Sequence, residues 1–420
     1  MKRRILLISD YVEGLPVIAS VRYEQLVKYI TGHFDVVVAS NSMYGENTRF
    51  ACEHLLFRSV SSRYTVNFKE GEEARRGRLE NILRRSLALK KIWKRCQKSP
   101  LVFRRRNREF CKQMGKLLRE NPVDAVLATV PELEALYAAL WVKSNFKSIP
   151  LICEMRDILD SDIWKDRAVG IVKRAEREMA ASSNGVIALS EGIANHYEAM
   201  TKDDVSLAVI RNGYEESDFE WAAGAVFDGR ELEKKGCIKF LHMGSIYEGR
   251  NVSDFLEGLL DFQGKTGIKA EFEVVGYADL AAVSDMERIA KESGGSLDIK
   301  LLGGMSHKDA IERLRDCNVA VILTHRKGSE YAIPGKTFEY IGAAKPVIAV
   351  STDKELLEIV AGRYGECAGH SPSEVSAALF RLLGASYEYS GRKEFSRSEQ
   401  AERIVSFIES VIRESKHITE

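Results

Sequence analysis

The chain has 420 residues, 45% of them hydrophobic and 29% charged, as expected of a folded protein with two or three domains. Its seven cysteines have neither CxxC nor Cys/His spacing, which excludes a structural zinc site and indicates reduced thiols. No apolar run approaches the roughly 18 residues of a membrane span, and ILLIS near the start is too short for a signal peptide. We therefore expect a cytoplasmic protein.

The formal net charge of +1 conceals one strongly basic segment, residues 74–119. This segment contains 17 Lys/Arg and two acids, a charge of +15, so the rest of the chain sums to −14. Apolar residues recur every three to four positions between the cations, as in basic amphipathic helices on anionic membranes. A solvated helix packed on the first domain is the alternative. Nucleic acid is not an expected partner, because the remainder of the chain is acidic and shows no nucleic-acid-reading module.

Ten short apolar strands are predicted, separated by helical patterns. The first five lie at 2–10, 34–40, 124–129, 149–155 and 185–189. The next five lie at 237–245, 270–276, 297–304, 319–324 and 345–350, after a linker expected over 219–236. This alternation predicts an α/β protein with two doubly wound domains of parallel strands. A final helix over 398–416 carries an apolar stripe that needs a surface to cover it.

The stretch IPGKTFEYIGAAKPVI, residues 333–348, places a lysine and a glutamate three positions apart on a short helix. The N–H groups of the helix start and Lys336 suit a phosphate, and Gly335 lets the backbone approach an anion. Glu339 stands among core-like neighbours, where a carboxylate can accept hydrogen bonds from the vicinal hydroxyls of a ribose. Together these residues predict a site for a nucleoside diphosphate.

A second loop, GSIYEGRN at 244–251, follows a strand of the same half of the chain. Gly244 permits a tight turn, Ser245 offers a hydrogen-bond donor of suitable size for a phosphate, and Arg250 can grip a diphosphate with two N–H groups. Two such loops at strand ends are a stronger signal than either alone.

Metal and nicotinamide chemistry are not expected. The eight histidines lack i, i+4 pairs, and His307 is expected at a helix start on the surface. The Asp-Ser-Asp at 160–162 resembles a metal-binding DxD, but it follows a strand of the first domain, away from Lys336. No GxGxxG follows the first strand, which argues against a dehydrogenase.

The two loops resemble the donor-site motifs of GT-B glycosyltransferases of the large retaining family 4, above all bacterial enzymes of capsule, O-antigen and exopolysaccharide assembly. ICEMRDIL (152–159), VIRNGYEESDF (209–219) and LGGMSHKDAIERLRDCNVAVILT (302–324) resemble other segments of that family, in the same order. The resemblance implies two Rossmann-like domains with an interdomain cleft. The expected domains are an acceptor domain (1–220), a nucleotide-sugar domain (221–396) and a C-terminal helix (397–420) that crosses back to the first domain.

The resemblance also assigns roles to single residues. Arg250 and Lys336 would neutralise the leaving diphosphate and Glu339 would bind the ribose, so these three are the expected catalytic residues. The other residues expected to bind the nucleotide sugar are Gly14, Gly244, Ser245, Gly276, Leu302, Gly303, Pro334, Gly335 and Thr337. Those expected near the acceptor or the sugar are Glu154, Arg156, Asp157 and Glu330. Neither a metal nor a cofactor is implied.

One position departs from the family pattern. Many members carry another glutamate eight positions before the ribose-binding one, where this chain has Tyr331, with Glu330 one position away. The expected function is a retaining glycosyltransferase that uses a lipid-linked or polysaccharide acceptor at the inner membrane face, bound through residues 74–119. A nucleotide-sugar epimerase of the same architecture and a non-catalytic scaffold subunit are the alternatives. The basic segment argues against the epimerase, Tyr331 favours the scaffold, and the retained Arg250, Lys336 and Glu339 argue against it.

Overall fold

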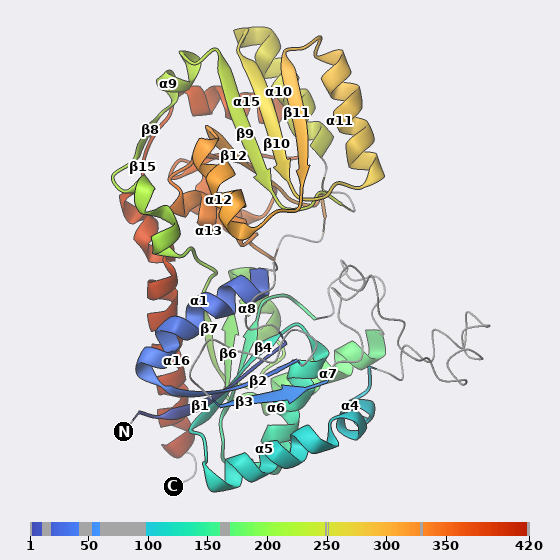
Figure 1. Ribbon diagram of the computed structural model, residues 1–420, viewed down its shortest axis with the longest axis vertical. Coiled ribbons are helices and arrows are strands. Elements are labelled where there is room, and N and C mark those ends of the chain that lie inside the picture. Colours follow the sequence, from blue (N-terminus) through green and yellow to red (C-terminus); the bar gives the residue numbers. More distant parts are fainter. Residues whose placement is uncertain are drawn as a thin grey trace, which may run out of the picture. The chain divides into compact units, whose positions relative to one another are not determined.

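The computed structural model describes residues 2–10, 18–41, 53–58, 98–159, 169–247, 250, 252–327 and 331–417. These residues form two compact α/β units, each built on one parallel sheet (Figure 1). The first unit contains the chain up to Leu189, Ile193–Val209 and the residues from Glu402 onward. The second contains Ser190–Gly192 and Ile210–Ala401. The predicted α/β class with two Rossmann-like units is confirmed.

The first unit has a seven-stranded sheet in the order β3-β2-β1-β4-β5-β6-β7, with every pairing parallel. The strands are β1 (Arg4–Ser9), β2 (Asp35–Asn41), β3 (His54–Phe57), β4 (Ala125–Val130), β5 (Leu151–Met155), β6 (Gly185–Ala188) and β7 (Ser206–Val209). The central strands β4, β5 and β6 are buried along their whole length. Burial on both faces explains why their sequences are mostly apolar instead of alternating, with Thr129 and Glu154 as the polar exceptions.

Helices connect these strands and cover the sheet (Figure 1). They are α1 (Ile18–His33), α4 (Pro100–Arg106), α5 (Arg108–Glu120), α6 (Leu133–Asn145), α7 (Val169–Ser182) and α8 (Glu191–Glu198). The short helix α4 begins at the capping side chain of Ser99 with Pro100 in its first turn, a favourable helix start.

The second unit has a six-stranded parallel sheet in the order β11-β10-β9-β12-β13-β14. Its strands are β9 (Cys237–Met243), β10 (Lys269–Val275), β11 (Leu297–Gly303), β12 (Val319–Leu323), β13 (Val347–Val350) and β14 (Gly365–Ala368). Its helices are α9 (Gly229–Glu233), α10 (Val252–Thr266), α11 (Leu280–Glu292), α12 (His307–Asp316), α13 (Lys336–Gly342), α14 (Lys354–Val360) and α15 (Pro372–Gly384). The strand order reverses between β9 and β12. In open parallel sheets, ligands bind beyond the carboxyl ends of the strands at such a point.

The linker expected over 219–236 is wrong, because these residues are folded into the second unit. They contribute part of the 3-10 helix η2 (Glu216–Ala222), strand β8 (Val226–Asp228) and α9, and β8 pairs antiparallel with β15 (Ser386–Glu388). Phe219, Phe227 and Leu232 are buried in the core of this unit. Apolar side chains at these positions therefore anchor a segment whose charged and glycine-rich composition resembles a linker.

The last helix, α16 (Arg397–His417), begins among residues of the second unit, and from Glu402 onward it belongs to the first. The predicted apolar stripe is buried: Ile404, Ile408, Val411 and Ile412 are almost inaccessible. A Cβ atom added to Gly185 on β6 would lie 2.9 Å from Val411, so the helix packs directly on the start of that strand. Among the described residues, no helix is long and apolar enough to cross a membrane.

Candidate functional site

Three of the predicted glycines meet at the carboxyl edge of β9, β10 and β11. The N–H of Gly244 donates to Val275 at 2.7 Å, and Gly276 forms an isolated bridge with Gly303. A Cβ atom on Gly276 would lie 2.6 Å from the carbonyl of Gly244, and its φ of +147° is one that side chains rarely adopt. The close approach of these loops therefore requires glycine at position 276.

Lys336, the first residue of α13, lies buried beside this edge. Its Nζ donates to the backbone oxygen of Met243 at 2.6 Å and to Nε2 of His242 at 2.9 Å. A Cβ atom on Gly244 would lie 3.2 Å from the same Nζ, which shows that the ammonium group sits directly at the β9 turn. The structure thus brings the lysine of one predicted loop to the glycine of the other.

His242 is a functional candidate that the sequence analysis did not single out. Its Nδ1 lies 3.0 Å from the backbone oxygen of Val321, so this nitrogen carries the proton and Nε2 accepts from Lys336. Burial, Lys336 and Arg250 together hold the pKa of His242 well below its ordinary value. The imidazole is therefore neutral and supports Lys336 as a hydrogen-bond acceptor. A histidine near the end of a mostly apolar strand, in front of the Gly244 turn, was the sequence signal for this residue.

Arg250 supplies a second cation at this edge. One terminal nitrogen of its guanidinium donates to the backbone oxygen of Ser245 at 2.9 Å, and the group lies 4.9 Å from the ring centre of Tyr247. Its Nε is buried and has no hydrogen-bond partner among the described residues. Burial lowers the pKa of Arg250, which indicates that its charge is incompletely compensated.

Arg250 also acts on Lys336. Burial first and Arg250 second lower the pKa of Lys336 well below its ordinary value, while Glu339 opposes this shift. In the part of the chain that the structure describes, neither cation forms an ion pair with a carboxylate. The hydroxyl oxygen of Thr337 is also buried without a described partner. A buried lysine, a partly buried arginine and unsatisfied polar atoms at one edge form a site with the electrostatics to hold a polyanion.

The N–H groups at the start of α13 contribute less to anion binding than the sequence predicted. α13 has seven residues, and Thr337 and Phe338 already donate their N–H groups to the oxygens of Pro334 and Gly335, at 2.9 and 3.3 Å. The side chains of Lys336 and Arg250, more than the helix start, therefore supply the positive charge. Pro334 and Gly335 form the tight turn that places Lys336.

Glu339 lies one turn further along α13 and accepts a hydrogen bond from His307. The distance from Nε2 of His307 to Oε1 of Glu339 is 2.8 Å. His307 opens α12, so the predicted helix start is confirmed, and its ring is partly exposed while it contacts the glutamate. Arg250 and Glu339 both act on the pKa of Lys336, so the structure brings the three residues expected to be catalytic to one region of the second unit.

The other predicted nucleotide-binding residues line the same edge. The hydroxyl of Ser245 accepts a hydrogen bond from the N–H of Tyr277 at 3.3 Å, which joins the β9 and β10 loops. Leu302, near the end of β11, packs partly buried against the core of the unit. Gly303 has a φ of +73°. Gly14 and Glu330 lie outside the described residues.

In the first unit, Glu154 is fully buried at the end of β5. Its carboxylate accepts from Arg22 at 2.8 Å and from the hydroxyl of Tyr23 at 2.8 Å. Burial alone would raise the pKa of Glu154, but Arg22 and these hydrogen bonds outweigh it and lower the pKa. The carboxylate is thus occupied within the unit, in contrast to the expected contact with acceptor or sugar.

The two residues that follow are partly exposed. Nε of Arg156 donates to the hydroxyl of Thr129 at 2.9 Å, and Asp157 accepts from the N–H of Ile158 at 2.9 Å.

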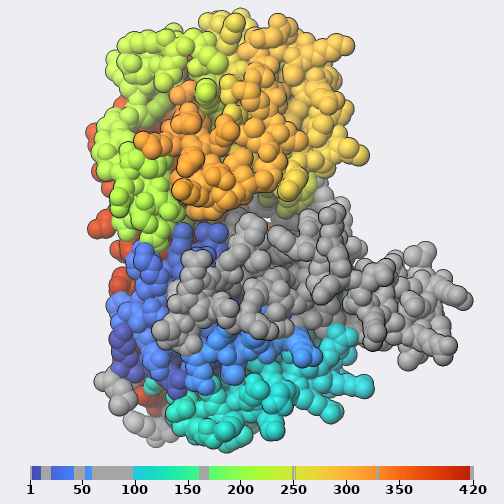
Figure 2. Space-filling model, in the orientation of Figure 1, coloured from blue at the N-terminus to red at the C-terminus, as the bar shows by residue number. Residues whose placement is uncertain are grey.

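The basic segment is described only from Lys98 onward, so residues 74–97 lie outside the description. α5 buries Phe110, Met114, Leu117 and Leu118 against the first unit. The exposed surface of α4 and α5 (cyan in Figure 2) carries seven cations together with Leu101 and two acids, Glu109 and Glu120. These cations are Arg104, Arg105, Arg106, Arg108, Lys112, Lys116 and Arg119.

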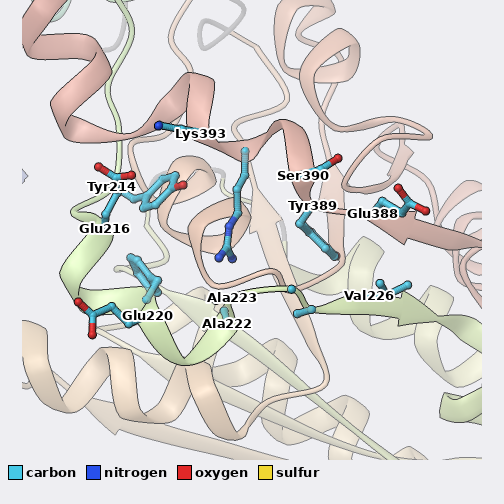
Figure 3. A pocket seen from close by; sticks show the side chains of 14 residues that line it. Tyr214, Glu216, Glu220, Ala222, Ala223, Val226, Glu388, Tyr389, Ser390 and Lys393 are labelled. Atoms are coloured by element: carbon cyan, nitrogen blue, oxygen red, sulfur yellow. The ribbon is translucent and has the colours of Figure 1, made fainter.

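A cavity of about 380 Å³ lies near Gly342, at the end of α13 opposite to Lys336. It is bounded by η2, β8 and the segment 388–393 (Figure 3). Figure 3 shows Tyr214 and Glu216 on one side and Tyr389 and Ser390 on the other. Arg392 lines it and donates to the backbone oxygen of Gly342 at 2.6 Å. Neither Lys336, Arg250 nor Glu339 lines this cavity, so it is separate from the cationic edge.

The residues that the structure describes contain no group of three or more His, Cys, Asp or Glu arranged to hold a metal ion. The charge at the edge comes from protein cations.

No protein-family model matches the sequence, and neither does any curated protein. Solved structures do match over the whole chain. Anabaena HepE in complex with UDP and glucose is 14% identical over 99% of this chain and 98% of its own, with a TM-score of 0.56. The lipopolysaccharide outer core galactosyltransferase WaaB is 14% identical over 97% and 99%, with a TM-score of 0.62. A candidate UDP-N-acetylglucosamine 2-epimerase from Listeria monocytogenes is 13% identical over 99% of this chain and 98% of its own, with a TM-score of 0.54. At these identities the likeness establishes the GT-B fold.

Proposed function

We propose that this GT-B chain is a glycosyltransferase that moves a sugar from a nucleotide-diphosphate sugar to a lipid-linked or polysaccharide acceptor in cell-surface glycan synthesis. The observation that carries the proposal is the convergence of the buried Lys336 and the partly buried Arg250, neither with a described carboxylate in ion-pair contact. A diphosphate would compensate both charges, and Glu339 lies one helical turn away for the ribose. HepE, a protein of the same fold, was crystallised with UDP and glucose.

The chemistry follows from the charges at this edge. As the bond between the sugar C1 and the diphosphate oxygen breaks, negative charge develops on the leaving group next to Arg250 and Lys336. The acceptor oxygen bonds to C1, and its proton passes to the departing phosphate oxygen. Attack from the same face as the leaving group retains the anomeric configuration. Removal of one cation should slow transfer about 100-fold.

An epimerase is the second candidate, because a candidate epimerase has the same fold. The basic surface of α4 and α5 favours the transferase, since an epimerase acting on a soluble nucleotide sugar has no use for a membrane-facing surface.

We further propose family-4-like activity, with the first unit binding the acceptor and α4–α5 docking on the inner membrane face.

The decisive experiment incubates the protein with UDP-, GDP-, ADP- and dTDP-sugars, with and without extracted lipid-linked glycans. A transferase releases nucleoside diphosphate in proportion to new glycoside, whose anomeric proton coupling matches that of the sugar donor. An epimer that remains attached to its nucleotide would instead establish the epimerase. Binding and turnover absent across the whole panel would favour the non-catalytic scaffold.

A further inference from the structure

The contact between His307 and Glu339 joins two helices that the predicted site did not connect. His307 opens α12 and Glu339 lies in α13, 32 positions later in the chain. Their side chains are 34% and 20% exposed, so both reach the surface of the second unit while shielding each other. The imidazole of His307 is hydrogen-bonded to Oε1 of the Glu339 carboxylate. Within the described part of the chain, Oε2 has no such partner and stays available.

We infer that His307 is a positioning residue of the nucleotide site, which orients Glu339 toward the ribose hydroxyls and makes nucleotide affinity depend on pH. The inference rests on the proposed function, in which Glu339 binds the ribose. A glutamate side chain has three rotatable bonds, and fixing one oxygen removes much of that freedom before the nucleotide arrives. The orientation is thereby established in the free protein.

The charged groups around the imidazole determine the direction of the pH effect. The hydrogen bond to Glu339 raises the pKa of His307 above its ordinary value, although burial opposes it. Asp218 in η2 raises this pKa further, and Arg397 at the start of α16 lowers it. Lys308 and Asp309 follow on α12 itself. The proton is therefore retained to higher pH than on a free histidine, and the pair weakens as pH rises through this raised pKa.

The test compares two ligands by calorimetry: inorganic pyrophosphate, which needs only the cations, and the tightest binder among UDP, GDP and ADP, which also needs the ribose contact. H307A is expected to bind the nucleotide about tenfold more weakly and pyrophosphate as the wild type does. H307Q retains a side-chain N–H donor, so it should recover most of the affinity while losing the pH dependence. K308A, on the exposed neighbour, is the matched control.

The outcomes separate this inference from the proposed function. A wild-type protein that binds neither pyrophosphate nor a nucleotide contradicts the proposed function and the inference with it. A wild type that binds both ligands, with H307A binding both equally well, contradicts only the role of His307. An H307Q protein that keeps the wild-type pH dependence would also overturn it, because the titrating group would then lie elsewhere.

Discussion

The ammonium group of Lys336 lies 2.9 Å from Nε2 of His242, so a buried cation rests on a neutral imidazole. Val321 fixes the other ring nitrogen through a 3.0 Å hydrogen bond and thereby determines the tautomer. An acceptor with no charge of its own holds the lysine in place and leaves its positive charge uncancelled. This arrangement suits a site that must attract a polyanion.

Substitution of Lys336 by methionine should abolish most pyrophosphate binding and reduce sugar transfer about 100-fold. The aliphatic side chain fills the space but removes the charge next to Arg250. Calorimetric titration with pyrophosphate and product release from a nucleotide sugar measure the two effects. The matched control is K235M, on an exposed lysine of the same unit. Equal pyrophosphate affinity in K336M and wild type would contradict the assignment.

The lowered pKa of Lys336 predicts that ligand binding takes up protons. An anion favours the charged form, so uptake should increase as pH rises above the pKa of the free protein, and K336M should lose it. In the absence of ligand, Lys336 binds its proton more tightly in the unfolded chain than in the folded protein. The free energy of unfolding should therefore increase with pH until the ordinary lysine value of about 10.4 is reached. Calorimetry in buffers of different ionisation enthalpy measures the uptake.

Substitution of Glu154 by glutamine should destabilise the first unit by about 3–5 kcal/mol, because Arg22 would remain buried without its counter-charge. A double variant, R22M with E154L, should lose much less than the sum of the single losses. Since the folded carboxyl has a lowered pKa, its contribution is complete above the unfolded value of about 4.3 and disappears on further acidification. Urea unfolding measures these differences, and additive losses would argue against a coupled pair.

Substitution of Gly342 by alanine should destabilise the second unit by about 1–3 kcal/mol. The new Cβ atom would lie 2.5 Å from the ring of Tyr214, a wall of the cavity in Figure 3. A second substitution, Y214A, should recover part of the loss in the G342A background. G264A is the matched control, since its Cβ in α10 meets nothing within 4 Å. If G342A and the wild type had the same unfolding midpoint, the Tyr214 ring would have to move aside at no cost, and the prediction would be wrong.

Replacing Arg104, Arg105 and Arg108 by glutamine should weaken binding to anionic vesicles by about 100-fold, at about 1 kcal/mol for each cation near the surface. Binding of the wild type should fall steeply as salt increases. Vesicle sedimentation with phosphatidylglycerol against phosphatidylcholine measures both effects. A triple variant of exposed lysines in the second unit, K235Q/K291Q/K308Q, controls for net charge. If the wild type sedimented equally well with phosphatidylcholine and phosphatidylglycerol vesicles, electrostatic binding of this surface to membranes would be excluded.

The sequence predicted the long buried strands and the gathering of Arg250, Lys336 and Glu339, because apolar runs and loops at strand ends are local signals. It did not predict β3, β7 and β14, which are edge strands with partly exposed side chains and so lack a continuously buried apolar run, nor the three-residue strands β8 and β15. The sequence also failed to predict which polar side chains contact one another. Arg22 and Glu154 lie 132 positions apart, and two buried charges in separate elements give no periodic signal. The His307–Glu339 contact was missed for the same reason.

The division of α16 between the two units has a consequence for biosynthesis. The sheet of the first unit is complete once β7 has been made, yet the apolar residues that cover the start of β6 come from α16, about 200 residues later. During translation, the first unit therefore remains open along that side until α16 has left the ribosome. A chain stopped after Ala401 would leave this surface bare, and we expect such a fragment to need a chaperone or to aggregate.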